Sequence, residues 1–244
     1  VKRLLHDGRL AADLTERTLI HAIPVGFQVD GSPGVADPRG MHAQGLSLKM
    51  HLVTARTSGV QNLARCIAKC HLEINDLVVA PYAAGLSALV EDERDLGSIV
   101  IDMGGGTTSF SVFYEGAAVF TDCVPVGGGH VTSDIARGLS TPLAHAEKLK
   151  TLHGSAMPAA ADEREMLDVP QVGEEDGMPN RIPKSYLVSI IAPRIEETIE
   201  LVRQRLDASG VAGVAGQRVV LTGGASQLPG TRELASRIID NIKA

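Results

Sequence analysis

The sequence predicts an α/β fold, in which strands alternate with helices and glycine-rich turns. The first observation is a short apolar, β-branched run at Ser98–Ile101, which is typical of a buried strand and leads into Asp102 and a glycine triplet. The second is another apolar run, Arg218–Leu221, which is followed by a pair of glycines and a helix-forming segment. The third is a long stretch with apolar residues at helical spacing, Tyr186–Ser209.

Length and composition permit a substantial core and argue against two classes of protein. The chain has 244 residues, with a hydrophobic fraction of 44%, which suffices for one large domain or two small ones. Its net charge of −6 argues against a general nucleic-acid binder, which would carry a basic face. No apolar run is long enough to cross a membrane, and no signal peptide is recognisable. Because the chain begins with Val1 inside a helix-like pattern, we expect it to be a piece of a longer protein.

The first part of the chain predicts a small unit of mixed helices and strands. We expect a helix within Val1–Glu16, a strand over Thr18–Ile23 that Pro24 ends, and a half-buried strand over Leu46–Leu52, where apolar and polar residues alternate. A helix with one apolar face follows these strands. The residues of that face are Val60, Leu63, Ala64, Ile67 and Ala68.

The cysteines allow two interpretations. The chain has three, an odd and low count that fits a reducing compartment. Cys66 and Cys70, together with His71, could be metal ligands, but no second ligand pair has suitable spacing. We therefore favour the other interpretation, in which the two cysteines lie one turn apart on a packed helix face.

The segment before the central strand combines a short strand with a helix of small residues. Leu77–Ala80 is apolar and predicts the strand, and Pro81–Val90 predicts the helix. Small side chains let a helix approach its neighbour closely. This suits a hinge between two lobes, but it suits a tightly buried helix equally well.

The glycine triplet that follows the central strand predicts a phosphate site. Gly104–Gly106 lack a Cβ, so their backbone can turn sharply and lie against a ligand, and successive N–H groups in such a turn bind anions. Asp102 could hold a hydrated Mg²⁺, and Thr107 and Thr108 add hydroxyls. The alternative is an ordinary glycine-rich turn with a solvated aspartate. The preceding strand and the hairpin predicted at Phe110–Thr121 favour the phosphate site.

A second glycine loop, Val126–His130, precedes a helix. We expect this helix to begin near Asp134, with Thr132 or Ser133 as its cap. A glycine loop at a helix start suits an anion, because the first N–H groups and the helix dipole attract negative charge.

The next helix, Pro142–Leu152, places Glu147 and Lys150 on one face. From spacing alone, this pair is a solvated ion pair worth a few tenths of a kcal/mol. The following segment, Ser155–Pro183, is rich in proline and predicts irregular loops with one or two short strands.

The last part of the chain returns to strand and helix. We expect the helix Tyr186–Ser209 to be kinked at Pro193, which lacks an N–H donor. The strand Arg218–Leu221 leads into the glycine-rich turn Thr222–Gly230, and a helix begins at about Thr231. A tight turn of this kind can lie flat against a nucleoside.

Three motifs occur in an order that resembles the superfamily of ATPases containing actin, heat-shock chaperones and sugar kinases. They are Asp-x-Gly-Gly-Gly-Thr from Asp102, Glu-x-x-Lys from Glu147 and Thr-Gly-Gly from Thr222. Within that superfamily, nearly the whole chain resembles the bacterial cell-division family FtsA. The stretches that carry this closer resemblance are Ile23–Pro24, Asp37–Met41, Val90–Glu93, Ile101–Thr107, His130–Ala136, Ala146–Lys150 with Gly154–Ala156, and Leu221–Gly224.

The resemblance implies an actin-like (ribonuclease H-like) ATPase fold with a small α+β inserted subdomain, incomplete at both ends. Residues 1–75 would be the later part of the interaction subdomain peculiar to the family, and residues 76–96 a linker and helix of the large lobe. Residues 97–154 and 211–244 would form the nucleotide-binding subdomain of the second lobe. Residues 155–210 would form a small subdomain beside the cleft.

The resemblance also implies ATP and Mg²⁺ as cofactors, with Asp102 helping to hold the metal. The resemblance places Glu147 and Lys150 at the ribose and base, whereas their spacing alone indicates only a solvated ion pair. An aspartate usual in the family is replaced by Ser109, so we expect at most a slow ATPase and assign no catalytic residue. The residues implied at the nucleotide are Gly104, Gly105, Gly106 and Thr107 at the phosphates, Gly127 and Gly128 beside the cleft, Glu147 and Lys150 at the ribose and base, and Gly223, Gly224, Ala225 and Ser226 at the adenosine.

As function, the resemblance implies a scaffold that polymerises, tethers filaments of the tubulin-like protein FtsZ at the division site and recruits later division proteins. It would be cytoplasmic and peripheral on the inner face of the cell membrane, held there by a C-terminal amphipathic helix that this chain does not include. One alternative is an ATP-dependent small-molecule kinase of the same fold, although no carboxylate has an obvious claim to be its base. The other alternative is an actin-like scaffold of pilus assembly.

Overall fold

The computed structural model describes residues 1–10, 14–35, 37–173, 179–211, 213 and 218–239. The chain divides into two units. The first consists of Val1–Gly97 with Ser111–Thr121, and the second of Ser98–Phe110 with Asp122–Ala244. Within the described residues, no helix is both long enough and apolar enough to cross a bilayer.

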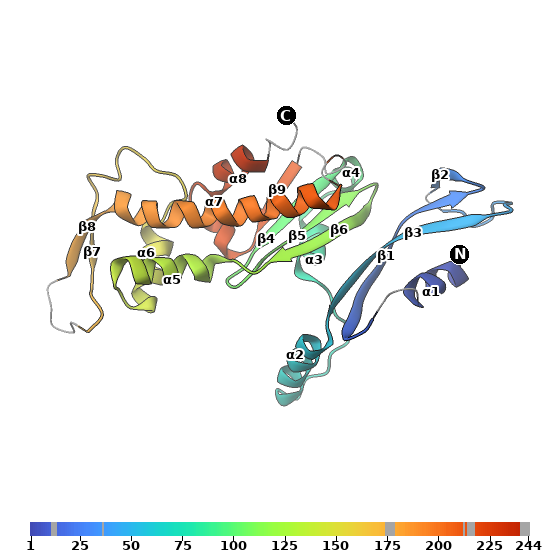
Figure 1. The fold of residues 1–244 in the computed structure, drawn as a ribbon, viewed down its shortest axis with the longest axis horizontal. Coiled ribbons are helices and arrows are strands. Elements are labelled where there is room, and N and C mark those ends of the chain that lie inside the picture. Colours follow the sequence, from blue (N-terminus) through green and yellow to red (C-terminus); the bar gives the residue numbers. More distant parts are fainter. Residues whose placement is uncertain (11–13, 36, 174–178, 212, 214–217, 240–244) are drawn as a thin grey trace. The chain divides into compact units, whose positions relative to one another are not determined.

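The first unit contains a three-stranded antiparallel sheet with the strand order β2-β1-β3 (Figure 1). Its strands are β1 (Arg17–Val29), β2 (Ser32–Val35) and β3 (Leu46–Arg56), and the helix α1 (Lys2–Leu10) contacts β3. The predicted helix and the alternating strand are therefore confirmed.

The first strand does not end where the sequence predicts, because β1 continues through Pro24. Pro24 lies opposite Met50 of β3, and the register of the two strands shifts between Pro24 and Gly26. The missing N–H of the proline thus falls where the ladder is already irregular, and such irregularities are where strands tolerate proline.

The other helices of the first unit are α2 (Thr57–Lys69), α3 (Ala80–Ala88) and α4 (Glu91–Leu96). The predicted helix α2 forms, but none of its residues is buried. Cys66 and its neighbour Cys70 are exposed, so the prediction of a packed cysteine face is wrong. Among the described residues, no group of three or more His, Cys, Asp or Glu side chains could hold a metal ion.

The predicted strand at Leu77–Ala80 does not form, because its backbone has other partners. The N–H of Val79 donates to Nε2 of His21 at 3.1 Å, and the N–H of Leu77 donates to the carboxylate of Asp76 at 2.7 Å. The helix α3 that follows packs closely, since a Cβ on Gly85 would lie 2.2 Å from the ring of Phe113. Tight packing therefore explains Gly85, whereas Ala83, Ser87 and Ala88 of the same helix are exposed.

A four-stranded sheet has the order β6-β5-β4-β9, with β4 (Ser98–Met103), β5 (Thr108–Tyr114), β6 (Ala117–Val124) and β9 (Arg218–Thr222). The strands β5 and β6 confirm the predicted hairpin, and both turn residues, Glu115 and Gly116, have positive φ as a two-residue hairpin turn requires. The buried strand β4 pairs in parallel with β9, so their carboxyl ends lie together.

The helices of the second unit are α5 (Gly128–Leu139), α6 (Leu143–His153), α7 (Lys184–Ser209) and α8 (Thr231–Ile239), and a short 3₁₀ helix, η1, spans Gly224–Gln227. Two short strands, β7 (Met166–Val169) and β8 (Asn180–Pro183), form an antiparallel pair. The long helix α7, drawn in orange in Figure 1, contains Pro193 and packs against α5 and α8. Its buried apolar stripe consists of Leu187, Val188, Ile191, Ile195, Ile199, Val202 and Leu206.

Candidate functional site

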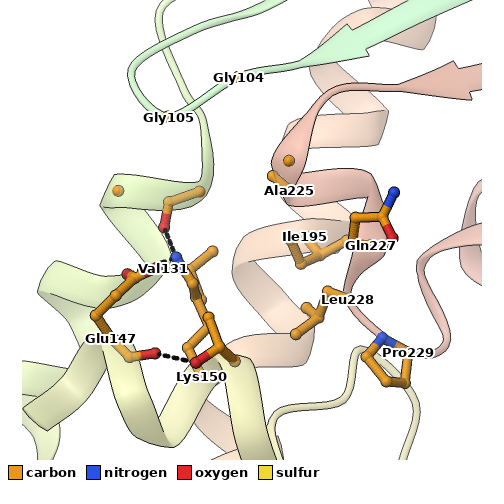
Figure 2. Close-up of a pocket in the computed structure, with 14 residues that line it drawn as sticks. Gly104, Gly105, Val131, Glu147, Lys150, Ile195, Ala225, Gln227, Leu228 and Pro229 are labelled. Atoms are coloured by element: carbon orange, nitrogen blue, oxygen red, sulfur yellow. Dashed lines mark hydrogen bonds and ion pairs between the residues drawn. The ribbon is translucent and has the colours of Figure 1, made fainter.

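The second unit contains a pocket of about 420 Å³, a volume typical of small-molecule sites. Figure 2 shows Gly104 and Gly105 at one end of it, with Glu147 and Lys150 on the side opposite Ala225. Segments that are distant in the sequence therefore meet here. The lining residues are Gly104, Gly105, Gly128, Gly129, Val131, Glu147, Lys150, Thr151, Ile195, Gly224, Ala225, Gln227, Leu228 and Pro229.

The two glycine loops are hydrogen-bonded to each other. The N–H of Gly128 donates to the carbonyl of Gly104 at 2.9 Å, and the N–H of Gly129 donates to the carbonyl of Gly105 at 2.7 Å. A Cβ on Gly127 would lie 2.5 Å from the Gly104 carbonyl oxygen, so no larger residue fits this approach. The N–H groups of Gly128 and Gly129 are therefore used by the first loop and do not offer themselves to an anion.

The helix α5 begins at Gly128, well before the predicted start near Asp134. Its N-cap is Gly127, whose N–H donates to Nδ1 of His130 at 3.1 Å. The predicted caps Thr132 and Ser133 instead lie inside the helix, where their hydroxyls donate back to backbone carbonyls one turn earlier. The prediction fails because the glycines, unfavourable in an isolated helix, are held by the first loop.

The first glycine loop keeps backbone donors available. The N–H of Gly104 donates to the carbonyl of Thr107 at 2.9 Å and closes the turn. Among the described residues, no hydrogen bond uses the N–H groups of Gly105 and Gly106, and both residues are exposed. A Cβ at either position would meet nothing within 4 Å. The loop thus offers open space and free donors, as a phosphate site needs.

Asp102 is half-buried at the end of β4, and its Oδ1 accepts a hydrogen bond of 3.4 Å from the hydroxyl of Thr222 on β9. Mg²⁺ is commonly held by one or two carboxylates together with water and phosphate oxygens. A single carboxylate next to the phosphate loop fits that donor set. Asp102 itself does not line the pocket.

Glu147 and Lys150 of α6 form an ion pair with Nζ to Oε2 at 2.7 Å. The Thr132 hydroxyl lies 2.5 Å from the same Oε2 and accepts a hydrogen bond from Nζ at 2.9 Å. Burial acts to raise the pKa of Glu147, but the hydrogen bonds from Lys150 and Thr132 outweigh it and leave the pKa below its usual value. The carboxylate is therefore ionised at neutral pH.

Several residues predicted at the nucleotide do not line the pocket, namely Gly106, Thr107, Gly127, Gly223 and Ser226. Gly127 and Gly223 directly precede lining residues. The hydroxyl of Ser226 donates to the carbonyl of Gly223 at 2.7 Å and so stabilises the turn around η1. Their nucleotide contacts, like those of the residues that do line the pocket, stay predictions.

Other lining residues were not singled out from the sequence. Ile195, which is 2% exposed, is one member of the apolar stripe of α7, and nothing distinguishes it from the others. Thr132 does not line the pocket but connects Glu147 with Lys150, although its sequence context predicts only a helix cap. The remaining unassigned lining residues are Gly129, Val131, Thr151, Gln227, Leu228 and Pro229.

Two family profiles match the chain. The profile described as cell division protein FtsA matches residues 99–243, and that of the SHS2 domain inserted in FtsA matches residues 1–54. The second match falls within the predicted subdomain 1–75, while the predicted division into four parts stays a prediction.

Curated relatives agree with these profiles. The cell division protein FtsA of Rhizobium meliloti is 49% identical over 226 residues, which cover 92% of this chain and 51% of that protein. The FtsA of Escherichia coli is 33% identical over 245 residues, which cover 98% of this chain and 58% of that protein. The chain thus spans about half the length of the curated relatives it matches.

Solved structures show the fold. The PilM–PilN type IV pilus biogenesis complex contains a chain similar to this one, with a TM-score of 0.63 at 18% identity, covering 100% of this chain and 59% of that chain. The ethanolamine utilization protein EutJ of Carboxydothermus hydrogenoformans has a TM-score of 0.50 at 24% identity, covering 72% and 52%. The predicted actin-like fold is confirmed.

Proposed function

Because the chain belongs to the FtsA family of cell division proteins, we propose that it forms the nucleotide-binding part of an actin-like scaffold of bacterial cell division. The observation that carries this proposal is the pocket of the second unit, where the open glycine loop meets the ion pair of α6 and the turn around η1. Family membership supports the role in cell division, and the pocket supports nucleotide binding.

In this proposal the pocket binds ATP. The phosphates lie against Gly104–Thr107, where no described residue accepts a hydrogen bond from the N–H groups of Gly105 and Gly106. The ribose lies towards Glu147, and the base lies towards Ala225 and its neighbours on the opposite side. Asp102 would hold Mg²⁺, which supplies positive charge that neutralises phosphate oxygens.

The nucleotide acts mainly as a ligand in this proposal. Hydrolysis needs a group that positions or deprotonates the attacking water, and the position where the family usually has an aspartate holds Ser109. At most a slow ATPase results. A bound nucleotide then stabilises one conformation of the scaffold through its contacts with the two glycine loops.

The scaffold role extends to partners outside this chain. We infer that the whole protein polymerises, tethers FtsZ filaments to the inner face of the cytoplasmic membrane and recruits later division proteins. Support for this part comes from membership in the FtsA family.

The test compares nucleotide binding by Gly105→Asp and Gly105→Asn in a full-length FtsA that contains this sequence. A Cβ at Gly105 would meet no described atom within 4 Å, so neither substitution clashes at its first side-chain atom. The carboxylate should repel the phosphates and weaken Mg·ATP binding by about tenfold or more, whereas the neutral isostere should weaken it much less. Isothermal titration calorimetry measures both affinities.

Sedimentation with FtsZ filaments then tests the scaffold role. We expect the wild-type protein to co-sediment more strongly with Mg·ATP than without it, and the Gly105→Asp variant to lose this dependence. Equal ATP binding by the wild type and Gly105→Asp would show that the loop is not the phosphate site. ATP binding without any co-sedimentation would leave the nucleotide site in place and contradict the FtsZ-tethering role.

A further inference from the structure

The side chain of Thr132 lies at the centre of the polar network that joins α5 to α6. Thr132 itself is only 7% exposed. Its hydroxyl has a single proton and two acceptors within reach, Oε2 of Glu147 at 2.5 Å and the carbonyl of Gly128 at 3.1 Å, while its oxygen accepts from Nζ of Lys150 at 2.9 Å. One hydroxyl therefore touches the pocket-lining glycine and both members of the ion pair.

The ammonium group of Lys150 has no donor left for a ligand. A lysine has three N–H donors. Those of Lys150 go to the Gly128 carbonyl at 3.1 Å, the Thr132 hydroxyl at 2.9 Å and Oε2 of Glu147 at 2.7 Å. The side chain is only 15% exposed, so its charge interacts with groups of the protein itself.

Glu147, unlike Lys150, keeps a polar atom available for a ligand. Its side chain is 50% exposed, and the hydrogen bonds that it accepts from Thr132 and Lys150 both go to Oε2. Oε1 has no partner among the described residues. Glu147 lines the pocket, and an ionised carboxylate oxygen accepts hydrogen bonds from neutral hydroxyls well, because such bonds are charge-assisted.

We propose that Thr132 is a positioning residue of the nucleotide pocket. Its hydroxyl holds the ammonium group of Lys150 in place and orients Glu147 so that Oε1 accepts hydrogen bonds from the ribose hydroxyls. This inference rests on the proposed function, since it names the ribose as the group that Glu147 contacts. It assigns Lys150 an indirect role, acting on the ligand through Glu147 and the first turn of α5.

The neighbouring residue supplies a matched control. The hydroxyl of Ser133 donates to the carbonyl of Gly129 at 3.0 Å, the same backbone bond one turn back that Thr132 makes to Gly128. Ser133 makes no hydrogen bond to Glu147 or Lys150. Removing its hydroxyl should therefore change the helix in a similar way without disturbing the ion pair.

The experiment measures the affinities of Mg·ATP and Mg·2′,3′-dideoxy-ATP, which lacks both ribose hydroxyls, in the full-length protein. The variants are Thr132→Val, which keeps shape but removes the hydroxyl, Thr132→Ser, which restores it, and the control Ser133→Ala. We expect the wild type and the control to prefer ATP by about tenfold or more, as a hydrogen bond to a charged group allows. Thr132→Val should lose most of this preference by weakening ATP alone, and Thr132→Ser should recover it.

The outcomes separate this inference from the proposed function. If Thr132→Val weakens both nucleotides equally, or leaves the preference intact, the residue has no positioning role and the inference is wrong. Failure of Thr132→Ser to restore the preference has the same meaning. A wild type that binds both nucleotides equally overturns the ribose contact while the nucleotide site stands, and a wild type that binds neither overturns the proposed function together with the inference.

Discussion

At the scale of single residues, the glycines around the pocket are needed for two different physical reasons. Gly105 and Gly106 stand in open space, so their contribution is the room and the backbone donors that they leave. Gly223 has a φ of +84°, which side chains rarely adopt, and a Cβ there would lie 2.5 Å from the Met103 carbonyl oxygen and 2.6 Å from Oδ1 of Asp102. It lets β9 turn away beside the end of β4.

This difference predicts a large effect for Gly223→Ala. The variant must strain the backbone and displace Asp102 or Met103, so the free energy of unfolding should fall by about 2 kcal/mol or more. Gly224→Ala is the matched control, because Gly224 has no positive φ and nothing within 4 Å of a Cβ. Urea denaturation measures both variants, and equal stability of the two would contradict the strain assigned to Gly223.

Glu147 predicts a dependence of stability on pH. Its pKa in the folded state is lower than the usual value of 4.5, so its ionised form stabilises the protein at pH values above about 4.5. This stabilisation should disappear as the pH falls through the lower, folded pKa. Because half of the side chain is exposed, we expect an effect of about 1 kcal/mol or less.

The measurement compares the wild type with Glu147→Gln in denaturant unfolding between acid and neutral pH. The wild type should be the more stable of the two at neutral pH, and the difference should shrink in acid. A difference that is constant with pH, or that grows in acid, would show that the hydrogen bonds of Lys150 and Thr132 do not favour the ionised carboxylate.

At the scale of elements, the helix α7 supports the pocket from behind. Its apolar stripe is buried against α5 and α8, and Ile195 from this stripe reaches the pocket lining. A charged pair adds to the packing, because Nε of Arg194 lies 2.5 Å from Oδ2 of Asp134 on α5. The position of α5, and with it of Thr132, therefore depends on α7.

The variant Ile199→Ala tests how much the packing of α7 contributes to stability. Ile199 is 1% exposed, and removing its side chain leaves a cavity that should lower the free energy of unfolding by about 2–5 kcal/mol. Glu196→Ala, an exposed site on the same helix, should change it by only about 0.5 kcal/mol. Guanidinium unfolding curves of the two variants give both values, and a small effect at Ile199 would argue against a packed core beneath the pocket.

At the scale of the whole molecule, every residue that lines the pocket belongs to the second unit. The first unit contains the small sheet of β1, β2 and β3, of which only Phe27 and Val29 are buried apolar residues. The proposed nucleotide contacts are therefore confined to one unit.

Mg·ATP should consequently protect the two units unequally. Amide hydrogen exchange should slow at Gly104–Thr107, at the start of α5 and around η1, and should change little in β1 and β3. At a free concentration of 100 times Kd, binding stabilises the folded state by about 2.7 kcal/mol. Mass spectrometry of exchanged peptides makes the comparison, with magnesium alone as its control, and protection confined to β1 and β3 would contradict a nucleotide site in the second unit.

Local patterns in the sequence determined most elements of the fold. The buried run before Asp102, the hairpin turn at Glu115–Gly116 and the stripe of α7 all form as predicted, because strand and helix periodicities and positive-φ turns are properties of a few neighbouring residues. The family resemblance added the fold, and its motifs brought Glu147 and Lys150 to attention although their spacing alone indicates a surface ion pair.

Only the tertiary structure decided what depends on distant partners. The segment at Leu77 has apolar strand character, yet hydrogen bonds to Asp76 and His21 keep it from forming a strand. The start of α5 moved to Gly128 because the first glycine loop accepts its N–H groups. The position of Thr132 between Glu147 and Lys150 likewise depends on partners from another helix. A polar side chain shows its own hydrogen-bonding capacity in the sequence, but which groups satisfy it is settled by the packing of elements far apart in the chain.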